Sequence, residues 1–103
     1  MYKIVLLPLA ADDIRAATQW YAEKGSNLGE RFKNEVSSQI DNLKDDVIER
    51  APVYQELSRV FIKKFPYVIY YQKQSSAGVI IVFAVLHQKQ NRDTLSKRVK
   101  PGM

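Results

Sequence analysis

The chain has 103 residues, with 16 Lys and Arg against 11 Asp and Glu, and it contains no cysteine. This length fits one domain, and a hydrophobic content of 46% is enough for a single core, which excludes a disordered chain. The lack of cysteine excludes disulfides and thiolate metal sites. We expect one domain over residues 1–103, with a basic and mobile tail from about residue 88 that can carry a short helix.

Charge is unevenly divided, because residues 1–50 carry a net charge of −2 and residues 51–103 a net charge of +7. Such a positive field attracts nucleic acid or an acidic protein, and it also favours solubility without any specific partner. The longest apolar runs, 4–7 and 79–86, are far shorter than the roughly 20 residues of a membrane helix. No export signal opens the sequence. We therefore expect a cytoplasmic protein without a membrane partner.

The first predicted elements are a strand and a helix. Residues 2–7 form a short apolar run that ends at Pro8, which has no backbone N–H for a continuing ladder. Residues 10–24 place apolar side chains at helical spacing. Asp12 and Asp13 fall in the first turn of this predicted helix, where the helix dipole favours negative charge.

A second helix is predicted after Gly25, the expected stop of the first. It is expected to begin at Asn27, whose side chain would form a capping box with Glu30. Its apolar stripe consists of Leu28, Phe32, Val36, Ile40, Leu43 and Val47. Spacings of three and four residues predict one apolar helix face that continues until Ala51 and Pro52.

Three strands are predicted in the rest of the chain, over residues 57–64, 67–73 and 79–87. Strict alternation would divide the last strand into two apolar faces: Val79, Ile81, Phe83 and Val85 on one, and Ile80, Val82, Ala84 and Leu86 on the other. The two helices are expected to pack as a hairpin on one face. The second face then needs the tail, a second copy or a partner chain to cover it.

Residues that could carry chemistry are few. His87 is the only histidine, which excludes zinc sites and two-histidine metal motifs, and the four glycines form no nucleotide-binding loop. We therefore expect no metal and no cofactor. The remaining set is basic and aromatic: Arg59, Lys63, Lys64, Tyr67, Tyr70, Tyr71, His87, Lys89 and Arg92. Such residues bind phosphate and stack on bases, although tyrosines are also ordinary residues of strands and cores.

Alternation along the first of these three strands places Arg59, Phe61 and Lys63 on one face and leaves Val60 and Ile62 for the core. Two cations would therefore project from one surface of the sheet. This spacing is compatible with binding to an anionic partner, but it does not specify one.

Several stretches together resemble the RelE/ParE superfamily of bacterial toxins: residues 28–32 (LGERF), Pro52, Tyr54, Arg59, residues 63–71 (KKFPYVIYY) and residues 84–87 (AVLH). The similarity extends from the first strand to about Arg92 and is typical of the branch often named plasmid-stabilisation proteins. It implies an α+β fold of order β-α-α-β-β-β, with a helical hairpin on one face of a curved, mainly antiparallel four-stranded sheet. It also implies the toxin of a type II toxin-antitoxin module, able to enter higher-order assemblies and held inactive by a cognate antitoxin that wraps around it.

The superfamily divides by mechanism. RelE-like members cleave mRNA in the ribosome, whereas ParE-like members inhibit DNA gyrase. Cleavage of RNA requires a base, cations that stabilise the developing phosphorane charge and an acid for the leaving oxygen. In this sequence the resemblance assigns those roles to four candidates: Arg59, Lys63, Lys64 and His87.

The end of the sequence departs from the family pattern. Where the family often has an Arg followed by Asp-Pro and a Trp, this chain has Gln90, Asn91, Arg92 and Leu95. No tyrosine follows Tyr71, although RelE-like nucleases often carry a functional aromatic residue near the C-terminus. We therefore favour ParE-like inhibition of gyrase. The alternatives are ribosome-dependent mRNA cleavage and a degenerate, non-toxic member that only binds its antitoxin.

Two contact surfaces are predicted from these observations. Target binding is assigned to Arg59, Lys64, Tyr67, Lys89 and Arg92, which lie in the basic half of the chain. Antitoxin binding is assigned to Phe61, Tyr70, Tyr71, Phe83 and Val85, on the face of the sheet that the helices leave open.

Overall fold

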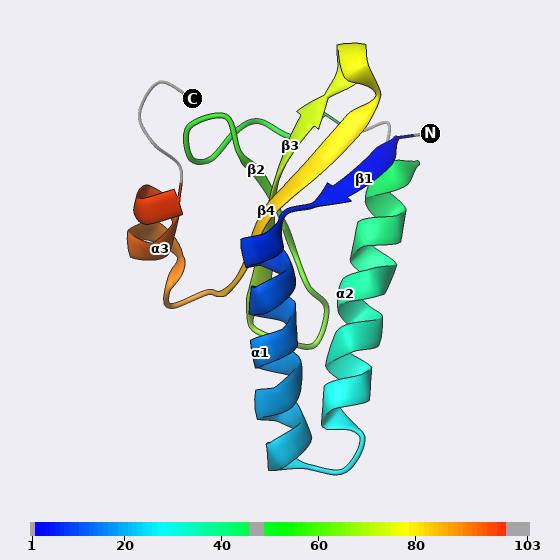
Figure 1. The fold of residues 1–103 in the computed structure, drawn as a ribbon, viewed down its shortest axis with the longest axis vertical. Coiled ribbons are helices and arrows are strands. Elements are labelled where there is room, and N and C mark those ends of the chain that lie inside the picture. Colours follow the sequence, from blue (N-terminus) through cyan, green and yellow to red (C-terminus); the bar gives the residue numbers. More distant parts are fainter. Residues whose placement is uncertain (1, 46–48, 99–103) are drawn as a thin grey trace.

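The computed structural model describes residues 2–45 and 49–98 and has an α+β fold (Figure 1). The elements are β1 (Lys3–Leu6), α1 (Pro8–Lys24), α2 (Leu28–Lys44), β2 (Ser58–Phe61), β3 (Tyr67–Gln74), a short 3-10 turn (Ser75–Ala77), β4 (Val79–His87) and α3 (Asn91–Arg98). The predicted order β-α-α-β-β-β is confirmed. The basic tail continues it with the short helix α3.

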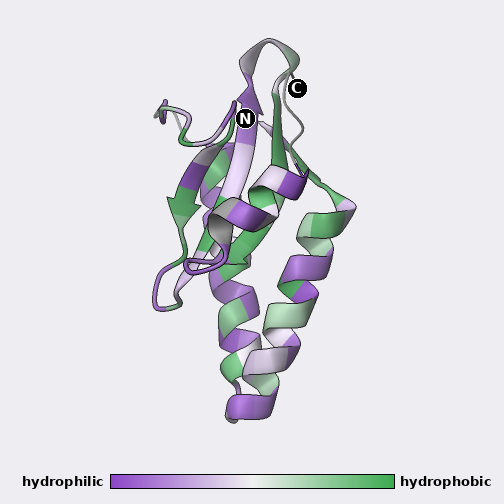
Figure 2. Ribbon diagram, turned by 90° about the vertical axis from the view of Figure 1, so that its left-hand side faces the viewer, coloured by the Kyte–Doolittle hydropathy of each residue, from purple (hydrophilic) through white to green (hydrophobic). Residues whose placement is uncertain are grey.

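The four strands form one open, mixed sheet in the order β1-β4-β3-β2. β1 runs parallel to β4, and the other two pairs are antiparallel, as the prediction of a mainly antiparallel sheet requires. α1 and α2 pack against each other as a hairpin, which Figure 1 shows below the sheet. Figure 2 faces the side on which α3 lies in Figure 1 and shows this polar helix in front of strands that are largely hydrophobic.

α1 begins two residues earlier than predicted, at Pro8. The same missing N–H that ends β1 is harmless in the first turn of a helix, where no intrahelical partner exists, so Pro8 serves both as strand stop and as helix start. As a result, Asp12 and Asp13 lie beyond the first turn, which contains no acidic residue. The dipole interaction predicted for them is wrong, and Asp13 has other partners.

The ends of α2 also differ from the prediction. Asn27 adopts a left-handed backbone conformation with φ of 67° and makes no side-chain capping hydrogen bond, so the capping box with Glu30 does not form. α2 ends at Lys44, earlier than the predicted end at Ala51 and Pro52, and Val47 lies outside the described residues. The apolar stripe therefore predicted the buried face of the helix correctly, but not its length.

Strict alternation fails in β4 because Phe83 is an extra residue. Tyr70 pairs with Ala84 and Tyr71 with Val82, which leaves Phe83 without a partner and makes a β-bulge. Val82 and Val85 consequently pack together in the core under the hairpin. Ala84 packs in a second core on the opposite face of the sheet.

The second face is thus covered in part by the chain's own tail, since Leu95 of α3 is buried in that second core beside Leu57 and Tyr70. The two faces of the sheet therefore carry separate cores. No helix among the described residues is long and apolar enough to cross a membrane.

Candidate functional site

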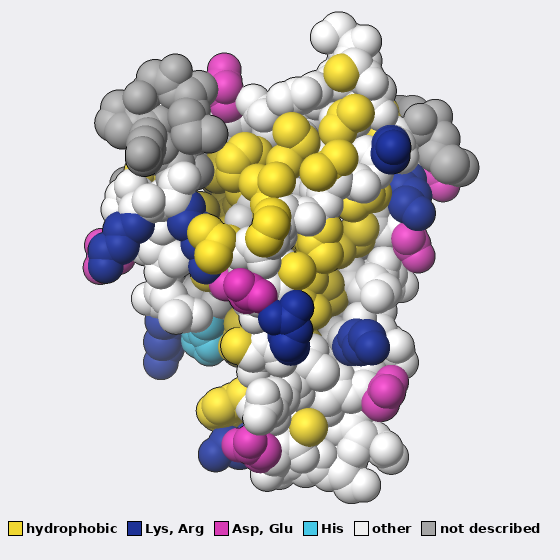
Figure 3. Space-filling model, in the orientation of Figure 1, with side chains coloured by type: hydrophobic (Ala, Val, Ile, Leu, Met, Phe, Trp, Pro, Cys, Tyr) yellow, Lys and Arg dark blue, Asp and Glu magenta, His cyan; other side chains and the backbone are white. Residues whose placement is uncertain are grey.

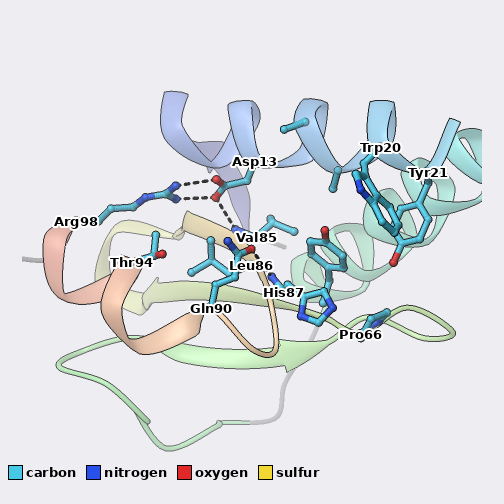
Figure 4. A pocket seen from close by; sticks show the side chains of 13 residues that line it. Asp13, Trp20, Tyr21, Pro66, Val85, Leu86, His87, Gln90, Thr94 and Arg98 are labelled. Carbon is cyan, nitrogen blue, oxygen red and sulfur yellow. Dashed lines mark hydrogen bonds and ion pairs between the residues drawn. The ribbon is translucent and has the colours of Figure 1, made fainter. Parts of the chain in front are cut away.

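A cavity of about 660 Å³ lies where α1, the adjoining ends of β3 and β4, and α3 meet. Its volume is in the range of typical ligand and side-chain pockets. α1 contributes Asp13, Ala16 and Trp20, β4 contributes His87, and α3 contributes Arg98. In Figure 4 these side chains converge on the space between the two helices. The cavity therefore joins segments from the two ends of the sequence.

Asp13 lies at one end of this cavity, and Trp20 lies at the other. Its carboxylate accepts two hydrogen bonds from the Arg98 guanidinium, at 2.6 and 2.7 Å, and a third from the backbone N–H of Val85 at 3.0 Å (Figure 4). The two side chains are only 12% and 17% exposed. These hydrogen bonds, followed by the charge of Asp13, raise the pKa of Arg98 above its usual value. Asp13 therefore ties α1, β4 and α3 together.

His87 lies at the end of β4 and packs edge-on against the ring of Tyr67, with centroids 5.3 Å apart. Its Nδ1 accepts a hydrogen bond from the backbone N–H of Lys89 at 3.1 Å. Because that lone pair is occupied, the neutral ring carries its proton on Nε2. His87 therefore presents a hydrogen-bond donor to its surroundings and not a free base at Nδ1.

The wall beneath the cavity is aromatic. Tyr21, Phe32, Phe65 and Tyr67 contact one another, with ring centroids 4.9 to 6.1 Å apart. Burial raises the pKa of both tyrosine hydroxyls, and for Tyr67 the neighbouring Tyr21 and Asp13 raise it further. Both phenols therefore stay protonated at neutral pH and can donate hydrogen bonds.

Trp20 stands at the rim, where it is 50% exposed. The Lys24 ammonium lies 4.9 Å from the centroid of its ring. A half-exposed tryptophan beside a cavity is typical of a contact residue, because it offers a large apolar area at a small cost in conformational entropy. Trp20, Asp13 and Arg98 are thus site residues that the sequence patterns do not predict.

The structure does not bring the four predicted nuclease residues together. Arg59 pairs with Tyr70 and lies on the face away from the hairpin, with its guanidinium 5.2 Å from the ring centroid of Phe61. Lys63 and Lys64 are exposed in the turn between β2 and β3. His87 belongs to the opposite face, beside Tyr67, so it does not share a surface with Arg59.

The predicted target-binding residues divide in a similar way. Tyr67 lines the cavity, while Lys64 and Lys89 are exposed next to residues that line it. Arg92 belongs to α3, but its side chain lies outside the described part of the chain. Arg59 pairs with Tyr70 and so lies on the opposite face of the sheet from Tyr67.

Three of the five predicted antitoxin contacts are core residues in this structure. Tyr70, Tyr71 and Val85 are all nearly inaccessible, and Tyr71 and Val85 face the hairpin. Phe61 is exposed and Phe83 half-buried, both on the opposite face.

Alternation predicts Val60 and Ile62 as core residues, and this is confirmed.

An exposed apolar strip runs along the edge of the sheet formed by β1 and β4. Val5 is 37% and Leu6 40% exposed, and Ile81, the register partner of Val5, is half-buried. Figure 3 shows hydrophobic side chains gathered across this region. We call these residues the edge strip: Val5, Ile81 and Phe83 on the face away from the hairpin, and Leu6 at the free edge of β1. In the sequence this surface corresponds to part of the apolar run at residues 2–7, and the structure shows that this strand has one neighbour in the sheet.

Among the described residues no group of three or more His, Cys, Asp or Glu side chains could hold a metal ion.

Comparisons with known proteins agree with this geometry. A family model described as the ParE toxin of the type II toxin-antitoxin system parDE matches residues 4–92. A solved structure described as a chromosomal ParDE toxin-antitoxin system from P. aeruginosa has a similar fold, with a TM-score of 0.70 at 13% identity. That match covers 84% of this chain and 96% of the other. No curated protein sequence matches.

Proposed function

The chain belongs to the ParE family of toxins from type II toxin-antitoxin systems, and from this premise we propose that it inhibits DNA gyrase and that a cognate antitoxin neutralises it. The antitoxin is the partner that a ParDE system implies. Gyrase as the target rests on the resemblance to the ParE branch. We also propose that the chain acts as one domain in the cytoplasm.

The observation that favours gyrase inhibition over mRNA cleavage is the separation of the candidate catalytic groups. A nuclease needs its cation and its acid within hydrogen-bond reach of the same phosphate. Here Arg59 lies on one face of the sheet and His87 on the other, and Nδ1 of His87 is already engaged by the Lys89 N–H. A toxin that acts by binding does not need these groups to meet.

The edge strip favours the binding of a partner protein to the sheet. Large apolar patches are rare on soluble monomers, and here Val5 and Leu6 are exposed on β1, a strand with an open edge because it pairs only with β4 in the described sheet. We propose that the antitoxin covers this strip together with Phe61. The predicted contacts at Tyr70, Tyr71 and Val85 would then support the surface from below.

We propose that target binding uses Lys64 and Lys89, which are exposed next to residues that line the cavity, together with Tyr67 and with Arg92 of α3, while Arg59 contributes from the other face. Substitution of Lys64 or Lys89 by alanine should reduce toxicity without loss of stability, because exposed side chains away from packing contacts usually alter stability by no more than about 0.5 kcal/mol. Full toxicity in both variants would refute this assignment.

The test of the mechanism uses purified toxin in two assays. Gyrase supercoiling should stop, and mRNA on programmed ribosomes should remain intact. His87→Gln should leave supercoiling inhibition nearly unchanged, whereas an acid or base role would cost roughly 10² to 10⁴ in cleavage rate. Codon-positioned cuts that disappear in His87→Gln would replace the gyrase proposal by mRNA cleavage. Normal growth on induction, without any arrest for the antitoxin to relieve, would identify a degenerate member.

A further inference from the structure

We propose that the cavity between α1 and α3 is an anchor pocket, into which an acidic segment of the antitoxin inserts one large apolar side chain. This inference rests on the proposed function, because it takes the antitoxin as the occupant. It adds a second contact region to the edge strip and places it on the other side of the Asp13–Arg98 ion pair.

The first argument is continuity along α1. Leu9, Asp13, Ala16 and Trp20 follow one another at helical spacings of four, three and four residues and so form one stripe. Leu9 is exposed in the first turn of α1, a short distance along the chain from the end of β1, whereas Ala16 and Trp20 line the cavity. A segment that covers the edge strip can therefore follow this stripe over the Asp13–Arg98 pair into the cavity.

The second argument is the chemistry inside the cavity. The two charged residues that line it, Asp13 and Arg98, form an ion pair with two short hydrogen bonds. Arg98 therefore has no free charge to offer a phosphate there. The remaining walls near the mouth include Trp20, Tyr67 and Pro66, which suit an aliphatic or aromatic side chain. Protein is thus favoured over nucleic acid as the source of the ligand.

The third argument is charge complementarity at the mouth. Lys24 lies over the Trp20 ring, Lys89 follows His87 by two residues, and Lys64 precedes Pro66 by two. All three lysines are exposed, and no carboxylate among the described residues pairs with them. An acidic segment would neutralise these charges while its apolar side chain fills the cavity.

The experiment measures the affinity of purified full-length toxin for the antitoxin encoded by the adjoining reading frame. Ala16→Phe fills the cavity from an exposed helical position, and Gln19→Phe adds the same ring at an exposed position of α1 that faces a different groove. We expect Ala16→Phe to weaken binding about 30-fold, in the range of a hot-spot loss. Gln19→Phe should stay within about threefold.

Two further measurements keep the outcome decisive. Trp20→Ala, which removes an exposed rim residue, should weaken binding about tenfold, so the inference does not depend on the folding of Ala16→Phe alone. Lys24→Glu and Lys89→Glu should weaken binding at low salt and lose this effect at about 1 M salt, whereas Lys33→Glu, at an exposed position of α2, should not. Thermal unfolding of each variant verifies that it is folded.

The failures of the two proposals are distinguishable. If wild-type toxin binds the antitoxin and Ala16→Phe and Trp20→Ala bind it equally well, the anchor pocket is refuted while the proposed function stands. If wild-type toxin does not bind the antitoxin, both are refuted. If a fluorescein-labelled single-stranded RNA of 12 nucleotides binds the toxin and Ala16→Phe abolishes only that binding, the cavity is a nucleic-acid site and the inference is overturned.

Discussion

Replacing Asp13 should destabilise the protein more than replacing any other carboxylate in an ion pair that the described structure contains. Asp13→Ala removes the only carboxylate partner of Arg98 and the acceptor of the Val85 N–H. This N–H lies in β4 beyond Val82, the last residue of β4 that pairs with β1, so the side chain of Asp13 takes the place of a strand neighbour. The substitution therefore affects a helix, the sheet and α3 together.

The magnitude follows from burial. A buried donor left without a partner costs about 1 to 3 kcal/mol, and breaking a buried ion pair costs about 3 to 5 kcal/mol. Arg98 is 17% exposed and lies in the last turn of a short helix, so its guanidinium can turn toward water, which favours the low end of both ranges. We expect a loss of about 3 kcal/mol for Asp13→Ala, or a decrease in melting temperature of about 12 °C for a domain of this size.

Urea unfolding of four variants tests this. Arg98→Met leaves the Asp13 carboxylate with the Val85 N–H as a remaining hydrogen-bond donor, so it should cost less than Asp13→Ala, and Asp13→Asn should fall between the two. Asp12→Ala is the matched control, since it removes the exposed ion pair with Arg15 and should cost less than about 1 kcal/mol. The reasoning would be refuted if Asp13→Ala cost no more than Asp12→Ala, or if Arg98→Met were the more damaging change.

Three further predictions concern backbone packing and titration. Gly29→Ala should destabilise the protein by about 1 to 2 kcal/mol in urea unfolding, because the added Cβ would lie 2.8 Å from the backbone oxygen of Thr18. This cost exceeds the gain from the better helix propensity of alanine. Gly25→Ala should be tolerated in the same assay, because its added Cβ would meet only the flexible side chain of Leu28. Gln55→Gly should stabilise by about 0.5 to 1 kcal/mol in calorimetry, since Gln55 has a φ of 53°. Because burial raises the folded-state pKa of Tyr67, its contribution to stability is complete below the unfolded-state value of about 10 and is lost as the pH rises above it. Tyr67→Phe should therefore lose less stability than wild type as the pH is raised beyond about 10.

The sequence was sufficient for most of the fold, because the helical stripe and the strands are local patterns. β4 was predicted with its observed bounds, and the predicted strand 67–73 lacks only Gln74 of β3. The bulge at Phe83 was not predictable, since it depends on the register between two strands and not on the composition of either. Because of the bulge, Ala84 and Val85 lie on the faces opposite to those expected. Val85, a predicted antitoxin contact, therefore faces the hairpin.

The site was harder to predict than the fold for the same reason. Asp13 meets Val85 and Arg98 across separations of 72 and 85 residues, which no local pattern encodes. Sequence reasoning could therefore recognise a basic and aromatic set, but it could not tell that Arg59 and His87 lie on opposite faces. A residue such as Trp20 could have been found from its place on the same helical stripe as Leu9 and Ala16.

The parallel pairing of β1 with β4 has a consequence for synthesis. Lys3 pairs with Val79, so β1 cannot form this pairing until β4 has been synthesised. The loop closed by this contact spans most of the chain, and such long-range pairings form slowly. The cavity needs α3 as well, which comes later still. A nascent chain therefore exposes α1 and α2 before the sheet or the cavity can form, and the cavity forms only after α3 has been synthesised.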